Sequence, residues 1–259
     1  MGLLDLLFVL ALNAVPLYGV YVLGWSAITV LLLYWFENLL TAVTTSIRIR
    51  LHRDWTRKRG HWRAKQLSSS FGRIDGSSTL LADYASAAFT FTIVHGVFVA
   101  LFVAFGRHLH AGDPLWQLSP AQFAQGAACF ALAAGVDLAG DLRTLRLRPF
   151  AWIKAYARRR LLRVVVLQLV IILGMAAVDA SDGPVGVVCL LIIAKTLADL
   201  FGSRFERNVM PDKPPEWFGG AASAIGQLAG STLDPMTMWQ QARQAAIDAA
   251  HEDEQVMPA

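Results

Sequence analysis

Several ionisable side chains lie inside long apolar stretches of this sequence. Glu37 and Asn38 stand together in one stretch, His95 lies in another, and Lys195 precedes Asp199 by four residues in a third. Ionisable residues are rare in such stretches, and they usually face the protein interior or a water-filled cavity. A lysine close to two carboxylates and a histidine forms a coupled set that can titrate near neutral pH. These residues are therefore candidates for a ligand site or a proton relay.

Spacing indicates which of these residues can pair. Lys195 and Asp199 are four residues apart, so they share one face of a helix. Glu37 is the other expected partner of Lys195, with His95 as a further relay member. Asn13 and Asn38 would supply hydrogen-bonding groups. The same set has a second interpretation, a structural ion-pair lock, because breaking a buried ion pair costs about 3–5 kcal/mol.

Composition narrows the class of protein. The 259 residues are 55% hydrophobic and only 16% charged, and the mean hydropathy is +0.46. A soluble domain carries about 25% charged residues. Cys129 and Cys189 both fall in apolar runs and form no disulfide framework. The sequence therefore excludes a water-soluble enzyme, a nucleic-acid-binding domain and a disulfide-stapled secreted module, and it predicts an all-α integral membrane protein.

Six apolar segments are long enough to cross a bilayer, which takes about 20 residues of helix. They are residues 3–23, 26–47, 80–105, 121–142, 161–178 and 185–205. Only Gly24 and Trp25 separate the first two, so these must form a tight hairpin. The sequence predicts a six-helix transmembrane bundle made of three hairpins.

The helical rise of about 1.5 Å per residue gives the depth of each polar group. Asn13, Glu37, Asn38, His95 and Lys195 fall near the midplane. A second, acidic layer lies nearer the cytoplasmic side, made up of Asp83, Asp137, Asp141 and Asp199. Asp141 is expected near the interface, paired with Arg143 or Arg146.

The distribution of Lys and Arg along the chain indicates how the six segments are oriented in the membrane. The stretch 48–73 holds nine Lys and Arg residues and the stretch 143–163 holds eight, whereas the intervening turns hold one or none. Because basic loops face the cytoplasm, this alternation places both termini and both basic loops there. We expect a multi-pass protein of the cell inner (cytoplasmic) membrane.

The basic loops suggest a partner. Lys and Arg near a membrane surface attract anionic lipid head groups, and His52, Trp55, His61 and Trp62 are interleaved with them as expected aromatic anchors. The expected partners are the bilayer and its anionic head groups rather than nucleic acid. A homo-oligomer is an open alternative.

The chain changes character after the sixth segment. Residues 1–206 are predicted to form the transmembrane domain and residues 207–259 a cytoplasmic tail. Asp234 followed by Pro235 is typical of a helix start, so a short helix is expected near 235–251. The acidic end, 251–259, is expected to fray.

Catalytic and metal-binding motifs are weak. His108, His110 and Asp113 would offer a poor metal site on a loop. The zinc-protease, nucleophile-elbow and phosphate-loop patterns are all missing from the sequence. No catalytic residue, metal or cofactor is predicted, and an enzyme is disfavoured.

Several runs resemble a known family. They are residues 13–20, Gly24-Trp25, residues 33–38, residues 94–99 and residues 194–200. Over about residues 8–205 the chain resembles DUF6498, a family of prokaryotic integral membrane proteins without an assigned activity. The family tends to carry two further histidines, where this chain has Ala87 and Gln168. The resemblance therefore implies the membrane fold and argues against a haem or di-histidine metal site.

Three functions follow as hypotheses. The first is a transporter, channel or ligand-binding membrane protein, proton-linked through Glu37, Lys195, Asp199 and His95. The second is a structural or interaction protein with a buried ion-pair lock. The third is an intramembrane enzyme acting on a lipid, for which no nucleophile and base stand out.

Overall fold

The computed structural model of this chain describes residues 15–16, 18–63, 79–109, 117–178 and 235–258. Over these residues the fold is helical, and the isolated bridge between Lys58 and Val256 is its one β-type pairing. The helical elements are α2 (Ala27–Thr56), the 3-10 helix η1 (Arg59–Trp62), α3 (Leu80–Leu109), α4 (Pro120–Leu145), α5 (Phe150–Val178) and α8 (Pro235–Glu254).

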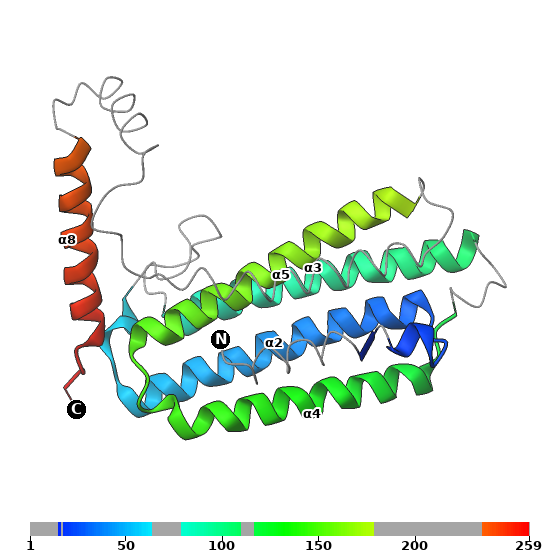
Figure 1. Ribbon diagram of the computed structural model, residues 1–259, viewed down its shortest axis with the longest axis horizontal. Coiled ribbons are helices and arrows are strands. Elements are labelled where there is room, and N and C mark those ends of the chain that lie inside the picture. Colours follow the sequence, from blue (N-terminus) through cyan, green and yellow to red (C-terminus); the bar gives the residue numbers. More distant parts are fainter. Residues whose placement is uncertain (1–14, 17, 64–78, 110–116, 179–234, 259) are drawn as a thin grey trace.

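The four long helices lie side by side and alternate in direction (Figure 1). Helices α2 and α4 end where α3 and α5 begin, and η1 and α8 lie at this same end of the bundle. Helix α2 is central because it packs against α3, α4 and α5. Polar groups on α2 can therefore reach partners on three neighbouring helices.

The observed helices are longer than the apolar segments predicted from the sequence. Helix α2 continues nine residues beyond 47, and α5 begins eleven residues before 161. The added turns are rich in Arg and Lys, which are good helix formers. Hydropathy therefore located the apolar part of each helix rather than its ends. The first and sixth predicted segments lie wholly or mostly outside the described residues.

The predicted tight turn before α2 is confirmed. Gly24 takes a positive φ of 64°, a conformation that glycine adopts without steric cost. Ser26 then caps α2, its hydroxyl accepting a hydrogen bond from Thr29 N at 3.1 Å. Between them, Trp25 donates its backbone N–H to Gly19 O at 2.8 Å. The chain thus reverses and starts a new helix within a few residues.

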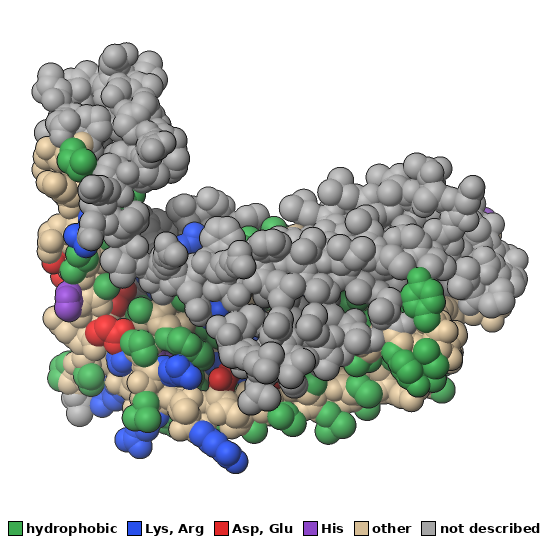
Figure 2. All heavy atoms as spheres, viewed as in Figure 1, with side chains coloured by type: hydrophobic (Ala, Val, Ile, Leu, Met, Phe, Trp, Pro, Cys, Tyr) green, Lys and Arg blue, Asp and Glu red, His purple; other side chains and the backbone are tan. Residues whose placement is uncertain are grey.

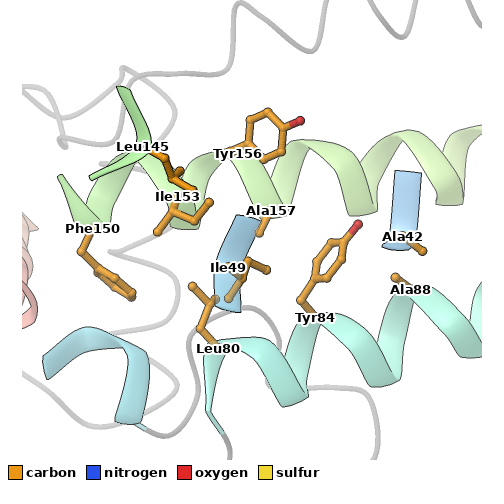
Figure 3. Close-up of a cluster of buried hydrophobic side chains, with 10 residues drawn as sticks. All are labelled: Ala42, Ile49, Leu80, Tyr84, Ala88, Leu145, Phe150, Ile153, Tyr156 and Ala157. Atoms are coloured by element: carbon orange, nitrogen blue, oxygen red, sulfur yellow. The ribbon is translucent and has the colours of Figure 1, made fainter. Parts of the chain in front are cut away.

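Two clusters of buried apolar side chains hold the helices together. One gathers around Trp25, Leu33, Tyr34, Val99 and Phe130, and joins α2, α3 and α4. The second joins α2, α3, α5 and the end of α4 near the end of the bundle that carries η1, and Figure 3 shows its members converging from these helices. They are Ala42, Ile49, Leu80, Tyr84, Ala88, Leu145, Phe150, Ile153, Tyr156 and Ala157.

The outside of the bundle is apolar along much of its length. Three of the described helices are long and apolar enough to cross a membrane, over Ile28–Thr56, Leu80–Phe105 and Pro120–Leu145. Large apolar side chains such as Ile93 (65% exposed) and Leu132 (71% exposed) face outward. In Figure 2 the Lys and Arg side chains gather towards the end of the molecule near α8. An apolar exterior with charge at one end suits a membrane protein.

The tail differs from its prediction. Pro235 does begin a helix, but α8 runs to Glu254, and the acidic end that was expected to fray is bound to the bundle. Arg59 N donates to Gln255 O at 2.7 Å, and Met257 N donates to Arg57 O at 2.9 Å. The prediction was wrong because the partners of this segment lie about 200 residues away in the sequence.

Candidate functional site

A buried ion pair joins the middle of α2 to α5. Arg163 Nη2 donates to Glu37 Oε1 at 2.5 Å, and both side chains are about nine-tenths buried. Glu37 lies ten residues into α2, about 15 Å along its axis, and Arg163 lies in the first half of α5. Two opposite charges at this depth stabilise one another, because neither is well solvated in an apolar bundle.

A hydrogen bond next to this pair joins α2 to α3. Asn38 Nδ2 and His95 Nδ1 are 3.3 Å apart, and both side chains are buried. An amide NH₂ only donates, so in this arrangement Nδ1 accepts and the neutral ring carries its hydrogen on Nε2. His95 Nε2 has no hydrogen-bond partner within the part of the chain that the structure describes. The imidazole is thus fixed through one nitrogen and offers the other as a buried donor.

The sequence runs 33–38 and 94–99 meet at this point. Trp35 Nε1 donates to Thr92 O at 3.0 Å, one turn before His95. A Cβ added to Gly96 would lie 2.8 Å from Trp35 Nε1, so glycine is what allows the indole to lie against α3 here. The indole and the Asn38 amide together fix the position of α3, and with it His95, against α2.

A second polar cluster surrounds Arg48, eleven residues further along α2. Its Nη2 binds Asp137 Oδ2 at 2.8 Å, and its Nε binds Asp141 Oδ2 at 2.8 Å. Arg160 of α5 also approaches Asp137, at 3.6 Å. The guanidinium groups of Arg48 and Arg160 lie 5.3 and 5.0 Å from the ring centre of Tyr156, within cation–π range. Two cations and two anions thus join α2, α4 and α5.

Most of the chain matches a known protein family. DUF6498, described as a family of unknown function, matches residues 3–216. The chain belongs to DUF6498. No curated protein and no solved structure matches it. The resemblance inferred from the short sequence runs is therefore confirmed, while an activity has to be argued from the site itself.

The structure of this DUF6498 protein brings together part of the predicted site. Asn38 and His95 meet between α2 and α3, and Glu37 is the neighbour of Asn38 on α2. Asn13, Lys195 and Asp199 lie outside the described residues. The partner seen for Glu37 is Arg163, whereas the sequence predicted Lys195. Glu37 has interactions beyond this pair, so a contact with Lys195 stays a prediction.

Two arginines of the DUF6498 protein were missed. Arg163 and Arg48 were counted only among the basic residues of the stretches 143–163 and 48–73, and Asp141 was predicted to pair with Arg143 or Arg146. The structure instead pairs Asp141 with Arg48, which is fully buried. The available signal was helical spacing, because Asp137 and Asp141 are four residues apart and present both carboxylates on one face.

Two histidines form a third contact in the DUF6498 protein, outside the apolar segments. His52 was expected to be an interfacial anchor, but it lies buried against His61, with His52 Nδ1 and His61 Nε2 2.8 Å apart. His52 Nε2 also lies 3.1 Å from Arg148 O. A carbonyl only accepts, so the neutral His52 ring donates through Nε2 and accepts from His61 through Nδ1. His61 also packs edge-on against Phe150, and this corner joins η1 to the start of α5.

Burial keeps His61 uncharged. Desolvation is the main cause that lowers the pKa of His61 from 6.5 to about 3, with smaller contributions from electrostatic coupling to His52 and from the positive charges of Arg53 and Lys58. Two histidines do not form a metal centre, and within the described ranges no three His, Cys, Asp or Glu side chains group to hold a metal. The pair is therefore a structural contact that tolerates only a neutral His61 ring.

This contact makes a testable contribution to acid sensitivity. The unfolded chain protonates His61 below about pH 6.5, whereas the folded protein does so only near pH 3. The contribution of His61 to the free energy of unfolding is thus complete above pH 6.5. It falls by about 1.4 kcal/mol per pH unit between pH 6.5 and about pH 3. We expect wild-type protein to lose about 2 kcal/mol more between neutral pH and pH 4.5–5 than His61→Asn does.

The measurement is unfolding in mixed micelles at a series of pH values, followed by tryptophan fluorescence. His251→Asn is the matched control, because His251 is exposed on α8, and it should keep the wild-type pH slope. Equal slopes in wild type and His61→Asn would show that the buried ring does not drive acid sensitivity.

Proposed function

We propose that this DUF6498 protein is a multi-pass membrane carrier that binds a small polar solute, together with a proton, inside its helix bundle. The observation that carries the proposal is His95. Its side chain is fully buried in an apolar helix, one nitrogen is held by Asn38, and the other points a hydrogen-bond donor into the bundle. An imidazole in this setting suits binding of a ligand and transfer of a proton.

Membrane placement is part of the proposal. Six spans, with both termini and both basic loops in the cytoplasm, fit the alternating helix directions and the charge at one end of the bundle. The inner membrane and its anionic lipids are the proposed surroundings. The described helices α2, α3 and α4 supply three of the spans.

The neighbours of His95 define the kind of solute. A ring nitrogen that donates requires an acceptor on the ligand, such as a carboxylate, a carbonyl or a hydroxyl oxygen. The Glu37–Arg163 pair lies on the adjoining face of α2, where its charges can respond when the ligand or a proton arrives. We therefore propose a solute that carries an oxygen acceptor, with the proton held at His95 or Glu37.

The test is solute-driven proton movement in liposomes. Purified protein is reconstituted with a trapped pH-sensitive dye, and a panel of amino acids, organic acids and sugars is added outside. We expect at least one solute to change the internal pH, and His95→Ala to reduce that rate by more than about ten-fold. His108→Ala is the matched control, because His108 lies on the same helix but is exposed. Equal rates in wild type and His95→Ala would reject the proposal.

A second candidate function rests on the Arg48 cluster. Arg48 is fully buried and is bound by two aspartates from α4, and Arg160 completes a network of four charges. Such a network fixes how three helices pack without any chemistry. We propose that this cluster is a structural lock that fixes helix packing. In this proposal His95 and Glu37, and not the Arg48 cluster, serve the carrier function.

A further inference from the structure

The acidic end of α8 is bound to basic residues at one end of the bundle. Glu254 Oε2 lies 2.6 Å from Lys58 Nζ. Glu252 Oε2 lies 2.8 Å and Asp253 Oδ1 lies 3.3 Å from Arg63 Nη1. Three consecutive carboxylates thus bind cations of the segment that follows α2. We call residues 252–258, in this docked position, the C-terminal clasp.

The clasp also contacts the beginning of α5. Glu254 Oε1 accepts a hydrogen bond from Ala151 N at 3.1 Å, in the first turn of that helix. Backbone N–H groups in a first helical turn have no partner within the helix and favour an anion. Asp253 is 6% exposed and also lies 3.9 Å from Lys154 Nζ. The clasp is therefore bound by the helix start as well as by three basic side chains.

The clasp has a backbone contribution too. Residues 57–59 and 255–257 pair through two hydrogen bonds, from Arg59 N to Gln255 O and from Met257 N to Arg57 O. Arg57 Nη2 further donates to Pro258 O at 2.9 Å. These amides are protected only while the clasp is docked, so they report its position directly.

The basic side chains that bind the clasp lie at the level where the proposed membrane placement puts the lipid head groups. Lys58, Arg63 and Lys154 follow or precede the apolar parts of α2 and α5. Basic residues at such positions attract anionic lipids with about 1 kcal/mol each. A lipid phosphodiester resembles a carboxylate, because it also carries one negative charge and acceptor oxygens. Carboxylate and phosphate therefore suit the same side chains.

We infer that the C-terminal clasp and anionic phospholipid compete for Lys58, Arg63 and Lys154, so that α8 stays docked on a neutral membrane and is released on an anionic one. The inference rests on the proposed membrane placement but not on carrier activity. Phosphatidylglycerol supplies the phosphate in the test. Because the docked carboxylates neutralise the same cations, release of the clasp exposes basic charge to the head groups.

The experiment is amide hydrogen exchange on the full chain in lipid nanodiscs. One set contains phosphatidylcholine alone, and the other about one third phosphatidylglycerol. We expect the amides of Arg59 and Met257 to exchange about ten-fold faster in the second set, while amides within α2 stay protected. Unchanged protection of Arg59 and Met257 would overturn the inference.

A variant without two of the clasp carboxylates tests whether the clasp and the lipid compete for the same cations. Asp253→Asn with Glu254→Gln should release the clasp already in phosphatidylcholine and bind fluorescent phosphatidylglycerol several-fold more tightly than wild type. Asp248→Asn is the matched control, because Asp248 accepts a hydrogen bond from Gln244 within α8. Equal lipid binding by wild type and the double variant would also overturn the inference. Failure to enter nanodiscs at all would instead reject the membrane placement on which it rests.

Discussion

Replacing both Asp137 and Asp141 by asparagine is expected to lower the free energy of unfolding by about 3–5 kcal/mol, the largest loss among the buried ion pairs. The physical reason is the position of their partner. Arg48 is fully buried, whereas the two aspartate side chains are 38% and 25% exposed. Without the carboxylates, the guanidinium keeps its charge, since arginine does not deprotonate in proteins. An uncompensated cation then remains in the core.

Replacing the arginine in place of the aspartates should lower the free energy of unfolding by less. Arg48→Met fills the buried position with an apolar side chain of comparable length, and the aspartates keep partial exposure and the nearby Arg160. We expect Arg48→Met to be clearly more stable than the double aspartate variant, and the triple variant to recover much of the loss. Unfolding in mixed micelles, followed by tryptophan fluorescence, measures all three. A triple variant whose loss equals the sum of the separate losses would show that these charges do not stabilise one another.

Helix content was the part of the fold that the sequence predicted best. An apolar run of about 20 residues is long enough to span a bilayer as a helix, in which every backbone hydrogen bond is made within the segment. The predicted segments at 26–47, 80–105 and 121–142 correspond to α2, α3 and α4. Their ends were misplaced because Arg and Lys continue a helix although they end an apolar run. Hydropathy marks where the side chains change from apolar to basic, which differs from where the helix stops.

Partners across helices were harder to predict. Glu37, Asn38 and His95 were recognised because a polar residue in an apolar run stands out locally. Which cation binds Glu37 depends on the rotation and vertical register of α5 against α2, and neither is encoded in a single segment. Arg163 was therefore only counted with the basic residues at the start of the fifth segment, and Lys195 was assigned to the site. The docking of residues 252–258 was missed for the same reason, since it joins segments about 200 residues apart in the sequence.

Replacing either member of the Glu37–Arg163 pair gives the second large effect that we expect. Glu37→Gln or Arg163→Met should each lower the free energy of unfolding by about 3 kcal/mol, because each leaves one buried charge without the other. Both side chains are about nine-tenths buried and lie 2.5 Å apart. The double variant leaves no charge of this pair unpaired, so its loss should be smaller than the sum of the single losses by about 2 kcal/mol.

Unfolding in mixed micelles completes this double-mutant cycle. Arg158→Met is the matched control, because Arg158 lies on the same helix but is exposed, and it should change stability by less than about 0.5 kcal/mol. Glu37 also interacts beyond Arg163, and a second cycle with Lys195→Met tests whether the predicted lysine is that partner. Purely additive losses would contradict the pairing. Single variants that gain stability would also contradict the expected loss, because they would show that these charges are held at a cost to the fold.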